Sequence, residues 1–430
     1  MNTLLSPPWI FPFCPQPPHW FLDWDSIQNH FDWIQNLKGC QQDPIYHAEG
    51  DVLIHTRMVC EALISSPNWR QLPEKERSIL FAAALLHDVA KPAFTKIEAD
   101  GRISSKGHAR QGARMVRQIL SQFEPPVQFD IRETVVAIVQ FGSLPIWLID
   151  KPNPQQSVIK VSQVVRCDFL ALLAEADVRG RLCSDRQELL DKIELFREFC
   201  QENNCLDSPR QFPSPHSRFI YFRKENGNPD YEAFDDTKCE VILMSGLPGS
   251  GKDYWIRKNL PDLPVISLDA LRKEMNVPPD ETPGNVVTAA KQRAREYMNE
   301  GRSFVWNATN TTKQMRQQLI NFFAAYQARI RIVYLEVPLE EILQRNRSRT
   351  APVPEAVIQK LAARLDIPDT VPFLVGFLRV TRLVTGLVEI RVIIAMVDHA
   401  RPPSADVRSS PTSISTGVSP IGPGDWSSSV

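Results

Sequence analysis

The first half of the chain repeats apolar residues with the period of an α-helix. Apolar positions recur every three or four residues in segments such as DVLIHTRMVCEALI, KERSILFAAALLHDVA and VVRCDFLALLAEADV. This spacing puts the apolar residues on one face of each helix and predicts an all-α bundle over 26–205. Residues 1–25 are rich in proline and aromatic side chains. We expect them to form an extended arm that packs through its tryptophans.

The pattern changes after residue 237. CEVILMSG is a short continuous apolar run, typical of a buried parallel strand, and a glycine-rich turn and a helix follow it. LPVISLDALRKEM, SFVWNATNTTKQMRQQLI and ARIRIVYLEVPLEEIL repeat the strand-then-helix order, which predicts an α/β domain with a parallel sheet over 238–370. Residues 206–237, rich in Pro, Asn and Asp, form the predicted linker. The Ser- and Pro-rich segment 371–430 is an atypical tail that we expect to be disordered.

Composition and charge exclude several classes of protein. Apolar residues make up 43% and charged residues 23% of the chain, which is typical of globular domains. Because 49 basic residues face 50 acidic ones, no global positive field exists to grip long nucleic acids, so a nucleic-acid partner would be held locally, at an end. No signal peptide or membrane span is expected, which indicates a cytoplasmic protein. The eight cysteines show no C-x-x-C pair and are expected to be buried thiols.

Histidines and carboxylates of the predicted bundle are the first candidate chemistry. His55 shares a helix face with apolar residues, and His87 ends the inward stripe of the next helix, with Asp88 beside it. Two histidines and a carboxylate on facing helices can bind a divalent metal. Asp168 and Asp177 each offer a further ligand, and because they lie about half a turn out of phase on one helix, only one should face the metal. The alternative for each residue is a satisfied polar group at the edge of the core.

Four segments in this region resemble the HD phosphohydrolase superfamily, and are closest to the HD domain attached to some tRNA CCA-adding enzymes. They are HT at 55–56, LHDVAKP at 86–92, GHARQGA at 107–113 and EADVRGR at 175–181. The resemblance implies a metal-dependent phosphomonoesterase or phosphodiesterase that uses a divalent transition metal such as Mn²⁺, Ni²⁺ or Co²⁺. It also implies that Lys91 neutralises a phosphate oxygen and that His108 serves the substrate or a second metal.

This HD-like segment departs from the pattern at one position. Gln140 and Phe141 stand where many such domains carry a histidine pair, which leaves a second metal open. The nucleotide-adding head of the CCA enzymes is absent, so CCA addition is not the expected activity. His47, in YHAEGD, has a ligand role and a structural role as equal alternatives.

SGLPGSGKDYW at 245–255 follows a predicted strand and opens a helix, the context that a phosphate-binding P-loop requires. Backbone N–H groups and the helix N-terminus hold the phosphates of ATP, and the lysine reaches the β and γ oxygens. The predicted ATP-binding residues are Gly246, Gly249, Ser250, Gly251, Lys252 and Asp253. Asp253 stands where a hydroxyl residue usually follows the lysine. A carboxylate there can hold Mg²⁺ directly or through water, and an inactive loop is the alternative.

The segments ISLDALRKEM, FVWNATN and LQRNRSR resemble their counterparts in polynucleotide 5′-kinases. The resemblance implies that Asp269 accepts the proton of an attacking hydroxyl and that Arg272 holds the acceptor's phosphate. It further implies that Arg345 and Arg349 belong to a lid that closes on the transferring phosphoryl group, next to the Lys252 site. The alternatives are a helix N-cap for Asp269 and a solvated basic turn for the two lid arginines.

The order of the two domains resembles the bacterial HD-Pnk end-healing proteins. RNA broken through its 2′-hydroxyl carries a 2′,3′-cyclic phosphate on one side and a 5′-hydroxyl on the other. The resemblance implies a 2′,3′-phosphoesterase joined to an ATP- and Mg²⁺-dependent 5′-hydroxyl kinase, with RNA or DNA ends as substrates. His216, Arg218 and Arg223 of the linker are candidates for a strand-binding surface, with a structural linker as the alternative. Two other functions stay open: a small-molecule or nucleotide kinase with an HD nucleotide hydrolase, and a non-catalytic ATP-binding scaffold.

Overall fold

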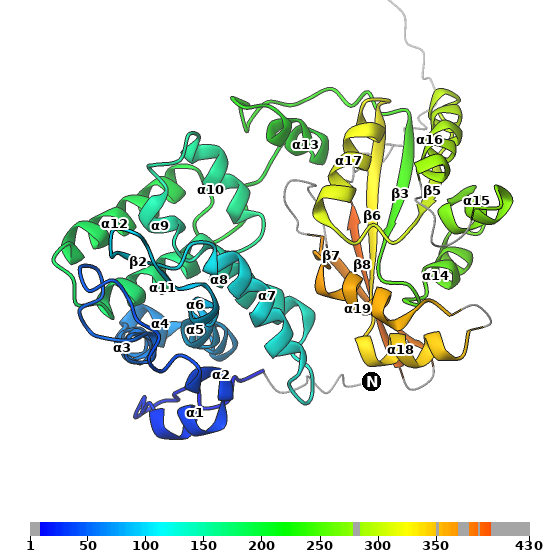
Figure 1. Cartoon of the computed structure of the whole chain (residues 1–430). Coiled ribbons are helices and arrows are strands. Elements are labelled where there is room, and N and C mark those ends of the chain that lie inside the picture. Colours follow the sequence, from blue (N-terminus) through cyan, green and yellow to red (C-terminus); the bar gives the residue numbers. More distant parts are fainter. Residues whose placement is uncertain (1–8, 278–283, 350–351, 369–377, 386–387, 397–430) are drawn as a thin grey trace, which may run out of the picture.

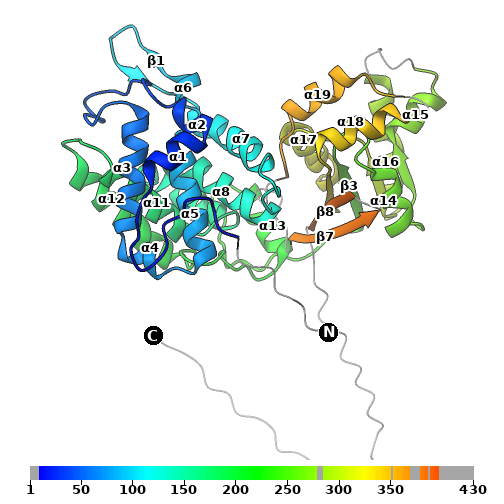
Figure 2. The same cartoon turned by 90° about the horizontal axis from the view of Figure 1, so that it is seen from below.

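The molecule has a helical part and an α/β part that lie side by side, with α13 between them (Figures 1 and 2). The predicted fold class is confirmed, because a helical N-terminal region precedes an α/β domain with a parallel sheet. The computed structural model describes residues 9–277, 284–349, 352–368, 378–385 and 388–396.

The helical part packs its helices around one apolar core. Its helices are α1 (Trp24–His30), α2 (Asp32–Gln35), α3 (Val52–Ser65), α4 (Pro67–Gln71), α5 (Glu74–Leu86), α6 (Lys91–Phe94), α7 (His108–Ser121), α8 (Phe129–Phe141), α9 (Leu144–Trp147), α10 (Pro154–Ser162), α11 (Cys167–Arg179) and α12 (Arg186–Glu202). A short antiparallel pair, β1 (Lys96–Ile97) and β2 (Ile103–Ser104), separates α6 from α7.

Two of these helices place the predicted metal ligands. Asp51 caps α3 by accepting a hydrogen bond from the backbone N–H of Ile54 at 3.0 Å, which fixes where that helix begins. α5 is buried continuously from Ser78 to Leu86, since its apolar residues surround the helix on all sides. Because α5 ends at Leu86, the residues that follow emerge from the middle of the core.

The N-terminal arm packs on this core through aromatic side chains. Phe11 is fully buried, and the Trp20 ring meets the Trp69 ring edge-on at 5.6 Å. The guanidinium groups of Arg70 and Arg77 lie over Trp20 at 5.5 and 5.3 Å. The arm is therefore part of the helical domain.

The α/β part is built on one sheet with the strand order β4-β5-β3-β6-β8-β7. The strands β3 to β6 pair in parallel, and β8 and β7 add antiparallel to the β6 edge. Their bounds are β3 (Cys239–Ser245), β4 (Val265–Ser267), β5 (Phe304–Asn307), β6 (Ala328–Glu336), β7 (Leu378–Thr385) and β8 (Val388–Met396). The helices are α13 (Pro215–Arg223), α14 (Lys252–Asn259), α15 (Leu268–Glu274), α16 (Gly284–Asn299), α17 (Lys313–Ala324), α18 (Leu339–Arg347) and α19 (Glu355–Ala363).

Helices cover both faces of this sheet, as its continuous apolar strands predict. Along β3, Val241 and Leu243 point into a core shared with α15, α16 and α17. Ile242 and Met244 point to the other face, where α14, α18 and α19 pack. The carboxyl end of β3, which leads into the glycine-rich turn, is thus held between two apolar layers.

Two predictions about segment boundaries need revision. The expected disordered tail contains β7 and β8, because its segment RLVTGLVEIRVII is rich in β-branched residues that favour strands. The other residues of that tail, 371–377, 386–387 and 397–430, lie outside the described residues. The predicted linker 206–237 contains the helix α13, which begins with Ser214 accepting a hydrogen bond from the backbone N–H of Ser217 at 3.0 Å.

The two parts contact each other through charged pairs. Arg132 of α8 donates to Glu336, at the end of β6, at 2.8 Å. Arg114 of α7 donates to Asp366 at 3.1 Å. A small apolar cluster extends the contact with Phe129, Tyr334, Leu365 and Ile367. α7 and α8 therefore link the HD-like helices to the carboxyl end of the sheet.

Candidate active sites

Four predicted metal ligands of the helical part converge on one point. The Nε2 atom of His55 lies 3.4 Å from Nε2 of His87 and 3.0 Å from Oδ1 of Asp177. Oδ2 of Asp88 lies 3.2 Å from Nε2 of His87 and 3.8 Å from Nε2 of His55. The helices α3 and α11 and the segment after α5 each contribute to this group, which we call the HD cluster.

Hydrogen bonds at the far side of each imidazole orient the two histidines. Nδ1 of His55 lies 2.9 Å from Oε1 of Glu49 and 3.3 Å from the carbonyl oxygen of Gly180, both acceptors. Nδ1 of His87 lies 2.7 Å from the carbonyl oxygen of Ala84. Nδ1 therefore carries the proton in both rings, which leaves Nε2 of each directed at the cluster.

The electrostatics of the HD cluster favour ionised carboxylates. Burial alone would raise the pKa of Asp88, but its contacts with His87 and Lys91 hold that pKa well below its usual range. Burial likewise opposes ionisation of Asp177, and Arg181 and His55 lower its pKa well below the usual range. Two carboxylates and two imidazoles are thus ready to act as ligands.

This donor set fits a divalent transition metal. Ligand atoms about 2.1 Å from one ion lie about 3.0–3.4 Å from each other, and most of the distances within the HD cluster fall in that range. Mixed nitrogen and oxygen donors suit borderline ions of the first transition row. The residues that would hold the ion are His55, His87, Asp88 and Asp177.

The predicted ligand Asp168 does not join the HD cluster. It lies in the first turn of α11, where Arg166 donates to both of its carboxylate oxygens, at 3.0 and 2.5 Å. Asp177 lies on the opposite side of the same helix, facing His55. One aspartate of α11 therefore faces the HD cluster, as the half-turn offset between the two requires. This aspartate is Asp177.

Two further predicted residues lie beside the HD cluster. Nζ of Lys91 lies 2.7 Å from Oδ2 of Asp88 and donates to Oε1 of Gln42 at 2.7 Å. Nε2 of His108, at the start of α7, lies 3.5 Å from Oδ1 of Asp88. Because Nδ1 of His108 faces the carbonyl oxygen of Ser105 at 2.7 Å, its Nε2 is the atom available to a ligand or a proton.

Sequence reasoning missed Glu49 and Arg181. Glu49 accepts from both His47 and His55, and these hydrogen bonds outweigh its burial and lower its pKa. Arg181 pairs with Asp177 one helical turn away. The i,i+4 spacing of Asp177 and Arg181 within EADVRGR is a signal that could have found the second of these. His47 contacts Glu49 at 2.8 Å, in the second layer around the cluster.

The P-loop has the geometry that its glycines predict. Gly246 has a φ of +147°, and a Cβ there would lie 2.8 Å from Oγ of Ser250 and 2.9 Å from the carbonyl oxygen of Leu335. Only glycine therefore fits this position. Nζ of Lys252 donates to the carbonyl oxygens of Gly246 and Leu247 at 3.0 and 2.9 Å. Burial lowers the pKa of Lys252 to about 8.

Polar atoms in the P-loop are available to a phosphate. The Ser250 hydroxyl is buried and has no hydrogen-bond partner among the described residues. Asp253 accepts from Nδ2 of Asn307, at the end of β5, at 2.6 Å. A carboxylate and a buried hydroxyl beside the lysine fit a nucleotide with Mg²⁺, since hard cations take oxygen ligands. Asp253, Ser250 and Lys252 would hold this pair.

Two further predicted kinase residues, Asp269 and Arg272, lie on α15. Asp269 is exposed in the first turn of α15, and its charge acts on Lys252. Ser267, not Asp269, caps that helix, since its side chain accepts from the backbone N–H of Ala270 at 3.3 Å. Arg272 follows Asp269 within α15. The N-cap alternative for Asp269 is therefore wrong.

The two lid arginines differ in their surroundings. Arg345 of α18 donates to Glu341, one turn earlier on the same helix, at 2.5 Å. Arg349 lies just after α18, where it is exposed and its charge contributes to the low pKa of Lys252. Arg349 is thus placed near the P-loop, whereas Arg345 has to leave Glu341 before it can contact a phosphate.

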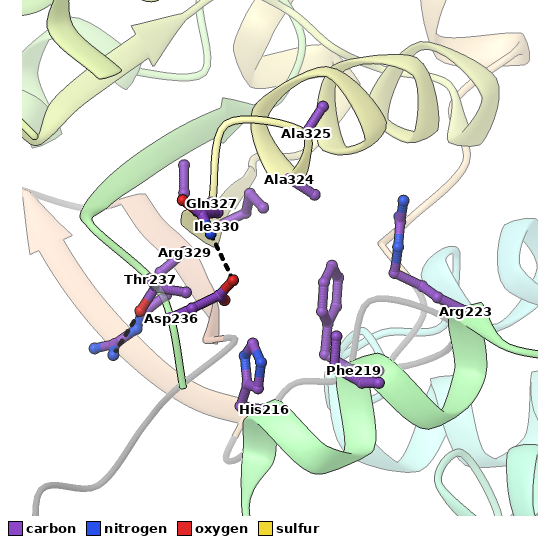
Figure 3. Close-up of a pocket in the computed structure, with 12 residues that line it drawn as sticks. His216, Phe219, Arg223, Asp236, Thr237, Ala324, Ala325, Gln327, Arg329 and Ile330 are labelled. Atoms are coloured by element: carbon purple, nitrogen blue, oxygen red, sulfur yellow. Dashed lines mark hydrogen bonds between the residues drawn. The ribbon is translucent and has the colours of Figure 1, made fainter. Parts of the chain in front are cut away.

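Two of the three candidate linker residues, His216 and Arg223, line a cavity far from both groups. Figure 3 shows His216, Phe219 and Arg223 of α13 facing Asp236 and Arg329, in a cavity of about 190 Å³. This cavity lies where β3 and β6 begin, at the opposite end of the sheet from the P-loop. His216 is buried. His216 and Arg223 therefore lie apart from the phosphate chemistry, and Arg218 donates to Gln163 at 3.3 Å.

Each half of the chain contains a segment that matches a known protein family. Residues 51–146 match the HD domain family, and residues 241–368 match a family described as an AAA domain. The L-seryl-tRNA(Sec) kinase of Methanococcus maripaludis is 23% identical over 138 residues, which are 30% of this chain and 54% of that protein. The chain thus spans about half the length of this curated relative.

One matching solved structure is that of the Pnkp1/Rnl/Hen1 RNA repair complex. The match covers 36% of this chain and 56% of the chain in that structure, with 17% sequence identity. Its TM-score of 0.28 is too low to indicate a shared fold. None of the described helices is long and apolar enough to cross a membrane. The chain therefore joins a segment that matches the HD domain family to a P-loop segment that matches the AAA domain family, in that order.

Proposed function

We propose that this protein heals both sides of a broken RNA strand. The HD cluster would open and remove a 2′,3′-cyclic phosphate, and the P-loop domain would phosphorylate the 5′-hydroxyl of the other fragment. The observation that carries the proposal is the presence of two complete, separate groups for phosphate chemistry on one chain: the HD cluster and the P-loop with Asp269.

The HD cluster supports phosphoester hydrolysis. The chemistry that a divalent ion supplies in such a site is polarisation of phosphorus–oxygen bonds and a lowered pKa for water. Lys91 places a positive charge beside Asp88, where it can neutralise a phosphate oxygen. Nε2 of His108 would exchange a proton with the leaving oxygen, and the contact of its Nδ1 with a backbone carbonyl supports this role.

An open hollow lies beside the segments that hold the HD cluster. Ile45, Ala48 and Leu182 line this hollow, which measures about 640 Å³. The backbone N–H of Leu182 donates to Glu49 at 2.8 Å, so the wall of the hollow is tied to the carboxylate that orients His55. Ile45 and Leu182 are exposed apolar side chains. They suit the flat face of a nucleobase whose phosphate lies at the HD cluster.

The P-loop domain supports phosphoryl transfer to a hydroxyl. Lys252 would exchange the carbonyl oxygens of Gly246 and Leu247 for phosphate oxygens when ATP binds. Asp269 is exposed, and its charge acts on Lys252. Because Ser267 caps α15, the carboxylate of Asp269 is available to the attacking hydroxyl. The match to a kinase whose name specifies a seryl-tRNA substrate favours an acceptor that belongs to an RNA.

The decisive test is an RNA that carries a 5′-hydroxyl and a 2′,3′-cyclic phosphate, incubated with ATP and a panel of divalent ions. We expect loss of the cyclic phosphate in the presence of a transition metal and transfer of the γ-phosphate to the 5′ end. Free nucleosides tested in parallel separate this activity from that of a small-molecule kinase. Binding of ATP without turnover on any acceptor would instead establish the scaffold and refute the proposal.

Replacing Asp269 with asparagine should remove the proton acceptor of the kinase. We expect kcat for 5′-phosphorylation to fall about 10²–10⁴-fold, with ATP affinity unchanged, since general-base catalysis typically contributes that much. Single-turnover kinetics and nucleotide titration measure the two quantities. Glu274→Gln, which neutralises another exposed carboxylate of α15, is the matched control and should leave kcat unchanged. Equal losses in both variants would remove Asp269 from the mechanism.

Asp253 offers a separate test of how the P-loop holds Mg²⁺. Asp253→Asn keeps the size of the side chain next to Asn307 but removes its charge. We expect the Mg²⁺ concentration for half-maximal kinase activity to rise about 10–100-fold, the usual cost of weakening a group that supports a bound metal. Asp253→Thr restores the common hydroxyl and should keep the lower requirement. An unchanged requirement in Asp253→Asn would show that the carboxylate does not act on the ion.

A further inference from the structure

Three cysteines that belong to neither active site come together inside the HD domain. Cys167 is the first residue of α11, Cys200 lies in the last turn of α12, and Cys205 follows in the next loop. Each is fully buried. Their three Sγ atoms all lie within 4.8 Å of one another. Because α11 rises about 1.5 Å per residue, Cys167 is about 15 Å from Asp177 of the HD cluster.

Backbone hydrogen bonds hold the three thiols in place. The N–H of Cys205 donates to the carbonyl oxygen of Cys200 at 2.9 Å, which closes the loop after α12. The N–H of Asp168 donates to the carbonyl oxygen of Leu206 at 2.9 Å and ties that loop to the start of α11. The sulfur atoms therefore converge through a defined backbone structure that joins two helix ends.

The surroundings of the cluster favour negative charge on one sulfur, that of Cys205, whereas the neighbouring thiols and burial raise the pKa of Cys167 and Cys200. Cys167 lies in the first turn of a 13-residue helix, where the helix dipole stabilises a thiolate. Nε of Arg210 is buried and has no hydrogen-bond partner among the described residues. Its charge lowers the pKa of Cys205, as do hydrogen bonds from the thiols of Cys167 and Cys200, which have the largest effect. The guanidinium also pairs with Asp230 and donates to the carbonyl oxygen of Asn203 at 3.4 Å, so Nε is the N–H that remains for a group at the thiols.

We propose that Cys167, Cys200 and Cys205 form a structural site for a thiophilic divalent ion, Zn²⁺, within the HD domain. Zinc–sulfur bonds of about 2.3 Å place sulfur atoms about 3.8 Å apart, so the thiols need to close in by less than about 1 Å. Three thiolates around Zn²⁺ carry one net negative charge, and the guanidinium of Arg210, which also pairs with Asp230, is the positive group beside them. The hydroxyl of Ser162, which donates to the carbonyl oxygen of Ile159 at 2.8 Å and lowers the pKa of Cys205, is the oxygen that we assign to the fourth position.

Such a site would fasten the end of the HD domain. It joins the start of α11, which carries Asp177, to the end of α12, immediately before the segment that leads to α13. In a site without access for water, zinc has a structural and not a catalytic role, because catalytic zinc keeps an open position. Its binding energy would add to the stability of the folded domain.

The test uses the full-length protein and Co²⁺ as a spectroscopic substitute for Zn²⁺. We expect thiolate-to-cobalt charge-transfer absorption in the near ultraviolet, a band that the nitrogen and oxygen ligands of the HD cluster do not produce. Zn²⁺ should abolish the band. Cys200→Ser should lose the band, and Cys60→Ser, which alters a fully buried thiol of α3 outside this group, should keep it.

A second measurement makes the test independent of how the variants fold. Metal analysis of the unaltered protein should find zinc that dialysis does not remove, and this zinc should remain in His87→Ala, in which the HD cluster lacks a ligand. No cobalt–thiolate band and no retained zinc in the unaltered protein would overturn the proposal. So would a titration of unfolded protein that finds two thiols fewer than the eight of the sequence, because that result would show a disulfide.

Discussion

Asp88→Asn is expected to abolish the phosphoesterase activity while the kinase activity stays intact. Oδ2 of Asp88 lies within 3.8 Å of both histidines of the HD cluster and 2.7 Å from Nζ of Lys91. Removing its charge would weaken one candidate ligand of the divalent ion and leave Lys91 without its carboxylate partner. Loss of a group that only supports a metal ligand typically costs about 10–100-fold in activity, so loss of the ligand itself should cost at least about 100-fold.

The measurement is release of phosphate from a 2′,3′-cyclic end, with 5′-phosphorylation of the same RNA as the internal control for folding. Asp168→Asn is the matched variant, since it neutralises the other candidate aspartate of α11, which pairs with Arg166 away from the cluster. We expect it to keep near-normal phosphoesterase activity, and Asp177→Asn to lose it. Loss of both activities in Asp88→Asn would contradict two independent sites, because nothing in the P-loop contacts this residue.

Local signals in the sequence were enough to place the P-loop. A buried strand, a glycine-rich turn and a helix follow each other without interruption, so the phosphate-binding geometry depends on residues within one segment. The position of the HD pair at 87–88 could also be predicted from the sequence, because the residues that follow a fully apolar helix lie near the core. The arrangement of both groups thus follows from short-range pattern and chain connectivity.

Contacts between distant segments could not be derived in the same way. Glu49 lies outside any helix, and its position depends on a hydrogen bond from the backbone of Leu182, 133 residues later. The choice of Asp177 over Asp168 required knowing which side of α11 faces α3. The three clustered cysteines likewise share no recognisable spacing, since Cys167 reaches Cys200 and Cys205 only through the packing of two helix ends.

The contact between the domains, which involves α7, is likewise a contact between distant segments that the sequence does not predict. His108 begins this helix beside the HD cluster, and Arg114, two turns along it, donates to Asp366 of the P-loop domain. Asp366 also accepts from the backbone N–H of Lys313, and its own N–H donates to Thr311, in the segment after β5. α7 therefore extends from the HD cluster to a residue that is hydrogen-bonded to the segment after β5.

Lys252→Ala should have the opposite effect to Asp88→Asn: loss of 5′-phosphorylation with phosphoesterase activity retained. Lys252 is the partly buried cation of the P-loop, held by the carbonyl oxygens of Gly246 and Leu247, and its charge would stabilise the transferring phosphoryl group. Removing one such preorganised group typically costs about 10²–10³-fold in kcat. Single-turnover transfer from ATP to a 5′-hydroxyl RNA measures this loss directly.

Lys258→Ala is the matched control, because it removes the same charge from the same helix, where Nζ of Lys258 lies over the ring of Tyr254 at 6.0 Å and away from the phosphate loop. We expect its kinase rate to stay within about twofold of the unaltered protein, the scatter usual for a surface substitution. If both lysine variants lost activity equally, general electrostatic attraction of the nucleotide would explain the effect, and the specific contact between Lys252 and the transferring phosphate would be refuted. A kinase loss confined to Lys252→Ala, set against a phosphoesterase loss confined to Asp88→Asn, would establish two chemically independent reactions on one chain.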